Sequence, residues 1–260
     1  MQMQMNGKAA IITGGSLGIG RAIAKRFLGA GGNVALAARR PEVLQEAKAE
    51  LEALGRGKVV SIAADVSKLE DCRFAFMRAE AELGKVDVLV NNAGTSQRGA
   101  FESISDELWH SDLDLKLFAQ IRLSRLALPG MKARRWGRIV NVLNTVAKAP
   151  PAEGAPTAVS RAAGMALTKI IAGEGAKHNV LCNALLVGRI ESDQWVRRHA
   201  GEQHNQTIEE YYAAMGKSLP MGRLGTAEEF ANAALFLASD AGSYINGTAL
   251  NVDGGLCPVV

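Results

Sequence analysis

Three glycines near the N-terminus form the first pattern in this sequence that indicates chemistry. The run TGGSLGIG, which begins at Thr13, places Gly14, Gly18 and Gly20 between a short apolar segment and a longer amphipathic one. Glycines at such a turn let the backbone approach a pyrophosphate, whose negative charge then lies at a helix N-terminus. The position between a predicted strand and a predicted helix makes the signal strong. The turn residues predicted to bind a dinucleotide are Gly14, Ser16, Leu17, Gly18, Ile19 and Gly20.

The end of the next apolar segment, NVALAARR, bears on which dinucleotide binds. An acidic residue there would accept hydrogen bonds from the free ribose 2′-hydroxyl of NAD. This sequence has Ala38 at that place, followed by Arg39 and Arg40. Because guanidinium groups can pair with a 2′-phosphate, NADP(H) is favoured over NAD(H). The alternative is that both arginines point into water.

Seven short apolar segments alternate with stretches of helical length, and they show little internal alternation of polar and apolar residues. This pattern is typical of a parallel sheet covered by helices on both faces. We therefore predict an α/β fold with a doubly wound parallel sheet of the Rossmann type, formed by one domain over residues 1–260. The predicted strands are AAIIT, NVALAA, KVVSIAA, VDVLVNN, GRIVNVL, NVLCNALLV and ALNVDGG.

One long connection interrupts this alternation, at residues 189–221. Connections of this length in compact domains are usually functional lids or disordered pieces. It contains SDQWVRRHA and IEEYYAAMGKSL, which can form short helices carrying Trp195, Tyr211 and Tyr212. We predict a flap that covers the substrate, with a plain surface insertion as the alternative.

Several motifs occur in the order found in one known family. They are TGxxxGxG, the pair DV after the third predicted strand, NNAG after the fourth, and the closing run from GRLGTAEEF to NVDGG. Over nearly its whole length the chain resembles the short-chain dehydrogenases/reductases. The resemblance implies a homotetramer with the helices around residues 105–132 and 157–177 at an interface. It also implies further cofactor contacts at Asp65, Val66, Asn92, Ala93, Gly94, Arg161, Gly188 and Ile190.

The family's proton-transfer residues are a Ser, a Tyr, a Lys four residues later and an Asn on the preceding helix. Counted along this sequence, those positions fall on Asn144, Thr157, Arg161 and Lys116 respectively. All four depart from the family pattern. No tyrosine lies near this stretch, and an aliphatic hydroxyl cannot replace a phenol as an acid.

The four replacements still offer chemistry to a hydride-transfer reaction. The Asn144 amide can donate to a developing oxyanion, and the Arg161 guanidinium can hydrogen-bond a ribose but cannot release its proton. A buried Lys116 beside Arg161 would have a lowered pKa, so we hypothesise that Lys116, or a water that it holds, supplies the proton. The alternative is that these side chains only pack or solvate an idle cleft.

These observations leave three functions open. The leading one is an NADP-dependent oxidoreductase with altered proton-transfer residues, acting on an unidentified small carbonyl, enoyl or hydroxy compound. The second is an NADP-binding pseudoenzyme or sensor without redox turnover. The third is a lyase or isomerase on the same scaffold, because a fold does not fix the reaction.

Composition argues against other classes of partner. The net charge is +4, and the one dense basic cluster, at residues 132–138, is interpreted as a solvated helix end, so we predict no nucleic-acid partner. No stretch approaches a membrane span and no secretory signal is present, which predicts a cytoplasmic protein without a membrane partner. His199, Glu202 and His204 lack the spacing of a zinc helix, so no metal site is predicted.

Overall fold

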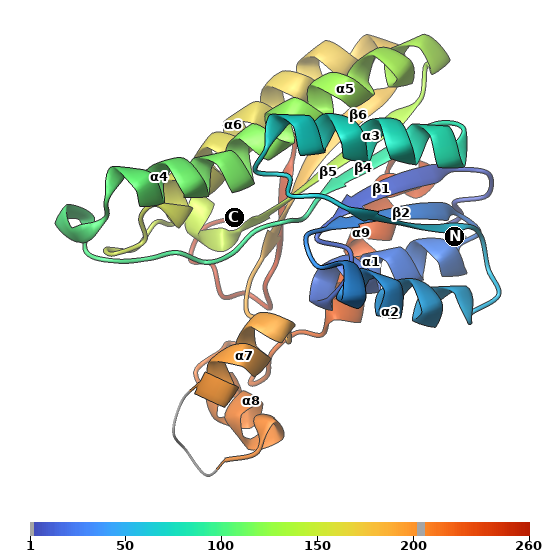
Figure 1. Ribbon diagram of the computed structural model, residues 1–260. Helices are drawn as coiled ribbons and strands as arrows, with labels where there is room; N and C mark the ends of the chain where they lie inside the picture. The colour runs from blue at the N-terminus through green and yellow to red at the C-terminus, as the bar shows by residue number, and fades with distance from the viewer. Residues whose placement is uncertain (1–2, 202–205) are drawn as a thin grey trace.

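The sheet determines where ligands can bind in this protein. The structure, a computed structural model, describes residues 3–201 and 206–260, and within them seven parallel strands pair in the order β3-β2-β1-β4-β5-β6-β7 (Figure 1). The strand order reverses between β1 and β4, which creates a crevice at the carboxyl ends of these strands. The strands are β1 Ala9–Thr13, β2 Asn33–Ala38, β3 Val59–Ala63, β4 Val88–Asn91, β5 Gly137–Asn144, β6 Val180–Val187 and β7 Ala249–Val252.

Helices cover both faces of the sheet, as the apolar character of the strands predicts. In Figure 1, helices α1, α2 and α9 lie on one side of the sheet, and α3, α5 and α6 lie on the other. The helices of the two layers are α1 Gly18–Gly29, α2 Pro41–Glu52, α9 Ala227–Ala238, α3 Leu69–Leu83, α5 Ala119–Arg134 and α6 Thr157–Gly175. The predicted doubly wound α/β fold is thus confirmed.

Alternate residues of each strand supply the two halves of the core. Ile12 of β1 packs with Phe27 and Phe230 in the cluster under α1 and α9, whereas its neighbour Ile11 packs with Leu123 in the cluster under α3 and α5. Successive side chains on a strand point to opposite faces, so a strand covered on both sides is apolar throughout. All five residues of β1 are buried for this reason.

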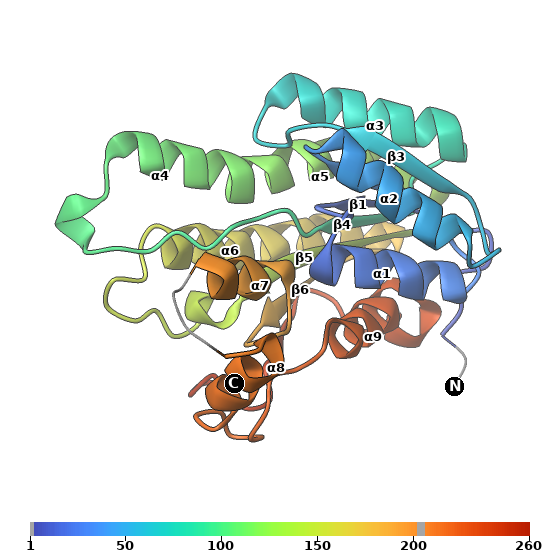
Figure 2. The ribbon, with the colours of Figure 1, turned by 60° about the horizontal axis from the view of Figure 1, so that its bottom comes forward.

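The remaining helices lie at the end of the sheet where the crevice opens. Helix α4, Asp106–Leu113, continues through the π-helix η2, Asp114–Phe118, into α5 without a break. The flap at residues 189–221 contains α7, Asp193–Gly201, and α8, Ile208–Gly216, and projects away from the sheet (Figures 1 and 2). Both predicted flap helices are therefore present. The short 3-10 helices are η1 Phe101–Ser103, η3 Thr145–Ala147, η4 Ala176–His178 and η5 Asp240–Gly242.

The basic cluster at residues 132–138 is only partly a solvated helix end. Helix α5 ends at Arg134 and β5 begins at Gly137, as predicted, but Arg138 is buried. Its guanidinium carbon lies 4.3 Å from the centre of the Trp136 ring, and one of its nitrogens lies 3.6 Å from a carboxylate oxygen of Asp240. The interpretation is wrong for Arg138, because this arginine is the second residue of a buried strand. Within the described residues, no helix has the length and apolar character needed to cross a membrane.

Candidate functional site

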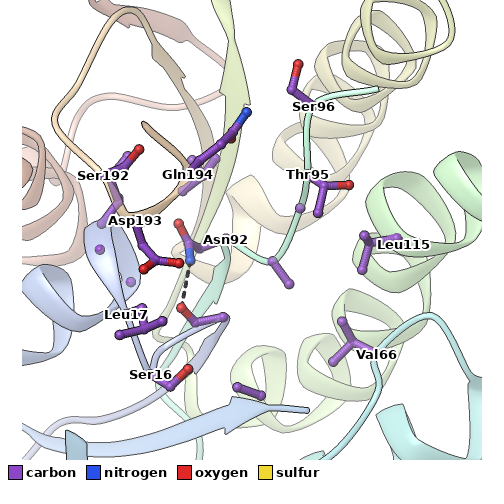
Figure 3. Close-up of a pocket in the computed structure, with 18 of the residues that line it drawn as sticks. Ser16, Leu17, Val66, Asn92, Thr95, Ser96, Leu115, Ser192, Asp193 and Gln194 are labelled. Atoms are coloured by element: carbon purple, nitrogen blue, oxygen red, sulfur yellow. Dashed lines mark hydrogen bonds between the residues drawn. The ribbon is translucent and has the colours of Figure 1, made fainter. Parts of the chain in front are cut away.

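A cavity of about 660 Å³ opens at the carboxyl ends of β1, β2, β4 and β5 (Figure 3). Most of the residues that the sequence assigns to the site line it, although they come from distant parts of the chain. They are Gly14, Ser16, Leu17, Gly18, Ile19, Gly20, Arg39, Arg40, Asp65, Val66, Asn92, Ala93, Gly94, Asn144 and Arg161.

The glycine turn has the geometry that a close backbone approach requires. Gly14 and Gly18 have positive φ angles of 65° and 52°, in the region that favours glycine. A Cβ at Gly20 would lie 2.2 Å from the carbonyl oxygen of Gly14. Leu17 at the N-cap of α1 offers no side-chain acceptor, so the first N–H groups of the helix remain available. These features fit the phosphates of a dinucleotide.

Asn92 and Thr13 hold the glycine turn against the loop after β4. The Asn92 amide donates to the backbone oxygen of Thr13 at 2.9 Å. It also donates to that of Gly14 at 3.2 Å, the bond drawn in Figure 3. The Thr13 hydroxyl accepts from the backbone N–H groups of Asn92 and Ala93, at 2.9 and 3.0 Å. Thr13 is a contribution that the sequence analysis missed.

The end of β2 brings positive charge to the cavity. Arg39 and Arg40 both line the cavity, and Arg40 is the N-cap residue of α2. Asp65 lines the same cavity, but its carboxylate already accepts from the backbone N–H and the hydroxyl of Ser67, at 3.1 and 2.8 Å. The contact of these arginines with a 2′-phosphate stays a prediction.

Lys116 lies in the π-helix η2, next in sequence to Leu115, which lines the cavity. Its side chain is fully buried, forms an ion pair with Asp112 one turn earlier, and donates a hydrogen bond of 2.7 Å to the Thr157 hydroxyl. Burial, reinforced by the charge of Arg161, lowers the pKa of Lys116 to about 8, although Asp112 opposes the shift. The expected lowering of this pKa is thus present.

Thr157, the first residue of α6, has a fully engaged hydroxyl group. Its oxygen accepts from Lys116 and from the backbone N–H of Gln97 at 3.0 Å, and its proton is donated to the Gln97 carbonyl at 2.7 Å. A threonine hydroxyl has one proton and two lone pairs, so all its capacity is used. Neither Thr157 nor Lys116 lines the cavity.

Arg161 and Asn144 are the two altered residues that do reach the cavity. Arg161 is anchored because one terminal nitrogen donates to the Val142 carbonyl at 2.9 Å. Within the described residues, its Nε atom and the Asn144 side-chain oxygen are buried without a hydrogen-bond partner. Burial lowers the pKa of Arg161 to about 10, which leaves the group charged at neutral pH. Both side chains have capacity to bind a ligand.

A second cavity of about 430 Å³ adjoins the first and shares Asn144 with it. Gly188 and Ile190, assigned to the cofactor by resemblance, line this second cavity instead of the first. The flap contributes Ser192 and Gln194 to both. A Cβ at Gly18 would lie 3.8 Å from the Asp193 backbone nitrogen, so the flap begins close to the glycine turn.

The residues that hold Lys116 and Thr157 are not among those predicted from the sequence. Asp112 is buried, and its second oxygen accepts a hydrogen bond of 2.7 Å from the Ser160 hydroxyl. The spacing of Asp112 and Lys116, four residues apart on one helix, could have identified this pair. Gln97 contacts Thr157 through its backbone, and nothing in the sequence indicates this contact.

No group of three metal-ligating side chains is found within residues 3–201 and 206–260. His199 lies 2.8 Å from the Gln206 carbonyl oxygen through its Nε2 atom. Glu202 and His204, which follow His199 in the sequence HAGEQH, lie outside the described residues.

Comparisons with known proteins agree with this architecture. A family model described as enoyl-(acyl carrier protein) reductase matches residues 14–257. The 3-oxoacyl-[acyl-carrier-protein] reductase FabG of Escherichia coli is 34% identical over 254 residues, covering 98% of this chain and 99% of that protein. The L-sorbose reductase of Gluconobacter frateurii, solved with NADPH and L-sorbose, is 33% identical with a TM-score of 0.94 over 100% of both chains.

A further solved structure is the NADPH-bound short chain oxidoreductase of Pseudomonas aeruginosa PAO1, described as containing an atypical catalytic center. It is 34% identical, with a TM-score of 0.91 and 99% of each chain covered. The glycine turn, the Asn92 contacts and the strand order described above occur in a chain that matches such proteins from end to end. This chain therefore belongs to the short-chain dehydrogenase/reductase family.

Proposed function

We propose that the protein is an NADP(H)-dependent oxidoreductase that transfers a hydride between the nicotinamide and a small carbonyl, enoyl or hydroxy compound. One observation carries the proposal. The glycine turn, Arg39 and Arg40 line the same cavity as Asn144 and Arg161. Two relatives of known structure, from Gluconobacter frateurii and Pseudomonas aeruginosa, are complexes with NADPH, which supports this choice of cofactor.

The chain offers separate groups to the separate parts of this cofactor. The N–H groups at the start of α1 would hold the pyrophosphate, and Arg39 and Arg40 would hold the 2′-phosphate. Arg161 would hydrogen-bond the ribose on the nicotinamide side, as the Lys at this position does in the family. When bound, the nicotinamide supplies or accepts the hydride.

Asn144 and Arg161 would stabilise the charge that develops on the substrate oxygen. Both reach the cavity, and Arg161 is held in place by its bond to the Val142 carbonyl before any substrate arrives, which is the condition for electrostatic stabilisation. We propose Lys116 as the source of the proton. This route requires the Thr157 hydroxyl to turn away from the Gln97 carbonyl, or a water to reach Lys116.

The altered residues also bear on the kind of substrate. Removing one general acid typically reduces a rate by about 10²- to 10⁴-fold. An activated alkene or an acidic enol needs less protonation during hydride transfer than a simple ketone does. We therefore propose that such compounds are better substrates than unactivated ketones.

The burial of Lys116 and Thr157 favours a second candidate function, an NADP-binding protein without turnover. The two functions are separated by mixing the purified chain with NADPH and a panel of ketones, activated alkenes and enols while NADPH fluorescence is followed. Oxidoreductase function predicts NADPH consumption with a reduced product. Binding without consumption across the whole panel would support the sensor, and product formation without nicotinamide oxidation would indicate a lyase or isomerase.

The flap and the quaternary structure complete the proposal. Because Ser192 and Gln194 of the flap line both cavities, the segment is suited to close over a bound substrate.

We also propose that the chain forms a homotetramer through the helices of residues 105–132 and 157–177.

A further inference from the structure

The second cavity lies where a substrate would meet the cofactor. It shares Asn144 and Ser96 with the first cavity, and a volume of about 430 Å³ is suitable for a small molecule. Its apolar walls come from the loop after β5, the end of β6 and the C-terminal segment. They comprise Val146, Ala149, Pro151, Val187, Leu256 and Pro258.

The charged residues that line this second cavity are all arginines. Arg98 comes from the loop after β4, Arg189 from the start of the flap, two residues after β6, and Arg198 from flap helix α7. No Asp or Glu is among the described residues that line it. A cleft that carries charge of one sign concentrates ligands of the opposite sign.

Two of the three arginines lie near an aromatic side chain. The guanidinium carbons of Arg189 and Arg198 lie 5.4 and 5.8 Å from the centre of the Trp195 ring. Within the described part of the chain, Arg98 and Arg189 form no ion pair. An anion in the cavity would therefore meet two guanidinium groups that have no carboxylate partner among the described residues.

We propose that the substrate carries a carboxylate, which Arg98 and Arg189 bind in the second cavity with Arg198 at the border to the cofactor. Guanidinium groups match a carboxylate with two parallel hydrogen bonds. The apolar walls would contact a short hydrocarbon chain, and the reacting carbon would lie toward Asn144. The inference rests on the proposed oxidoreductase function and narrows its substrate to a small oxo or enoyl acid.

Calorimetry tests carboxylate binding without requiring turnover. Hexanoate is titrated into the protein with NADPH present, with hexanamide and hexyl phosphate as matched probes. We expect hexanoate to bind at least about tenfold more tightly than hexanamide, which is the effect of losing one charge-assisted contact. Equal affinities for the acid and the amide would overturn the proposal. If hexyl phosphate binds more tightly than hexanoate, the site prefers a phosphate and the carboxylate proposal is wrong.

Two exposed arginines allow the site to be tested by substitution. Arg98→Gln and Arg189→Gln are each expected to weaken hexanoate binding about tenfold, while Arg26→Gln, at the far end of α1, leaves it unchanged. Neither Arg98 nor Arg189 lines the first cavity, so NADPH affinity should stay within about twofold in both variants. Unchanged hexanoate affinity in both variants would overturn the assignment.

Turnover then connects the site to the reaction. With NADPH, oxo acids should be reduced with a lower KM than their methyl esters, and Arg189→Gln should remove that difference. If NADPH is bound but never consumed, the oxidoreductase proposal fails while the carboxylate site stands on the calorimetry. If esters and acids are reduced equally well, the oxidoreductase proposal stands and the carboxylate site is wrong.

Discussion

Lys116 is a buried cation whose protonation state can be followed. Because its pKa is lowered to about 8, the ammonium is lost as pH rises through that value, well below the reference of 10.5. If Lys116 supplies the proton, kcat/KM for reduction is highest below about pH 8 and falls tenfold per pH unit above it. Reduction kinetics between pH 6 and about 10 measure this profile.

Replacing Lys116 tests whether this residue causes the expected pH dependence. Lys116→Met should lower kcat by at least about 10²-fold and remove the fall near pH 8, while Lys25→Met on the exposed side of α1 changes neither. Turnover that is unchanged in Lys116→Met would refute the role of this residue. An unaltered pH profile with a lower kcat would indicate that Lys116 only supports the packing around Thr157.

Arg39 and Arg40 determine coenzyme preference if the 2′-phosphate lies between them. Arg39→Ala and Arg40→Ala should each raise the Kd for NADPH about tenfold, because a charge-assisted contact is lost, and leave the Kd for NADH nearly unchanged. Fluorescence titration of the two reduced coenzymes measures both constants, with Arg26→Ala as the matched surface control. Equal losses for NADPH and NADH would mean that the arginines do not contact the phosphate.

The residues that line the first cavity and the residues around Lys116 differ in how well the sequence predicts them. Gly14, Gly20 and Arg39 belong to local motifs whose geometry follows from a strand, a turn and a helix close together in the chain. The packing of Lys116 against Thr157 joins residues 41 positions apart. No local pattern predicts that the Thr157 hydroxyl would be satisfied by a backbone segment at Gln97, so only the structure shows that this hydroxyl is not free for substrate.

Two of the three glycines in helix α1, Gly20 and Gly29, have opposite roles. Gly20 faces the turn, where a Cβ would meet the Gly14 carbonyl at 2.2 Å, whereas a Cβ at Gly29 would meet no atom within 4 Å. Gly20→Ala should displace the turn and abolish NADPH binding, while Gly29→Ala should keep binding and raise the free energy of unfolding by up to about 1 kcal/mol. Coenzyme titration and urea unfolding check both outcomes. Normal coenzyme binding in Gly20→Ala would contradict the assigned role of the turn.

The central strands were predictable because they are runs of residues covered on both faces, and such runs are largely apolar. The edge strand β7 is only partly buried. The flap helices were predictable from their length and flanking residues. The π-helix η2 was not, because one extra residue per turn leaves no compositional mark. This π-helix contains Lys116. Asp112, which forms an ion pair with Lys116, lies in the preceding helix α4.

Exposed apolar side chains on α6 form a candidate interface between subunits of the proposed tetramer. Val159 and Ile170 are 50% and 59% exposed, and their spacing of three helical turns places them on one face of α6. A stable interface must bury at least about 1,000 Å² with good complementarity, and apolar residues dominate the centre of such surfaces. This face belongs to the region that the proposed tetramer uses.

Light scattering after size-exclusion chromatography should therefore give a mass of four chains. Ile170→Asp places a charge on the proposed interface and should shift the mass to smaller species, because desolvating an unpaired carboxylate opposes association. Met77→Asp on α3 is the matched control, since Met77 is 66% exposed and lies outside the proposed interface. A tetramer that persists in Ile170→Asp, or dissociates equally in Met77→Asp, would contradict assembly through α6. Because α6 also contains Thr157 and Arg161, dissociation should also lower NADPH turnover if assembly supports the site.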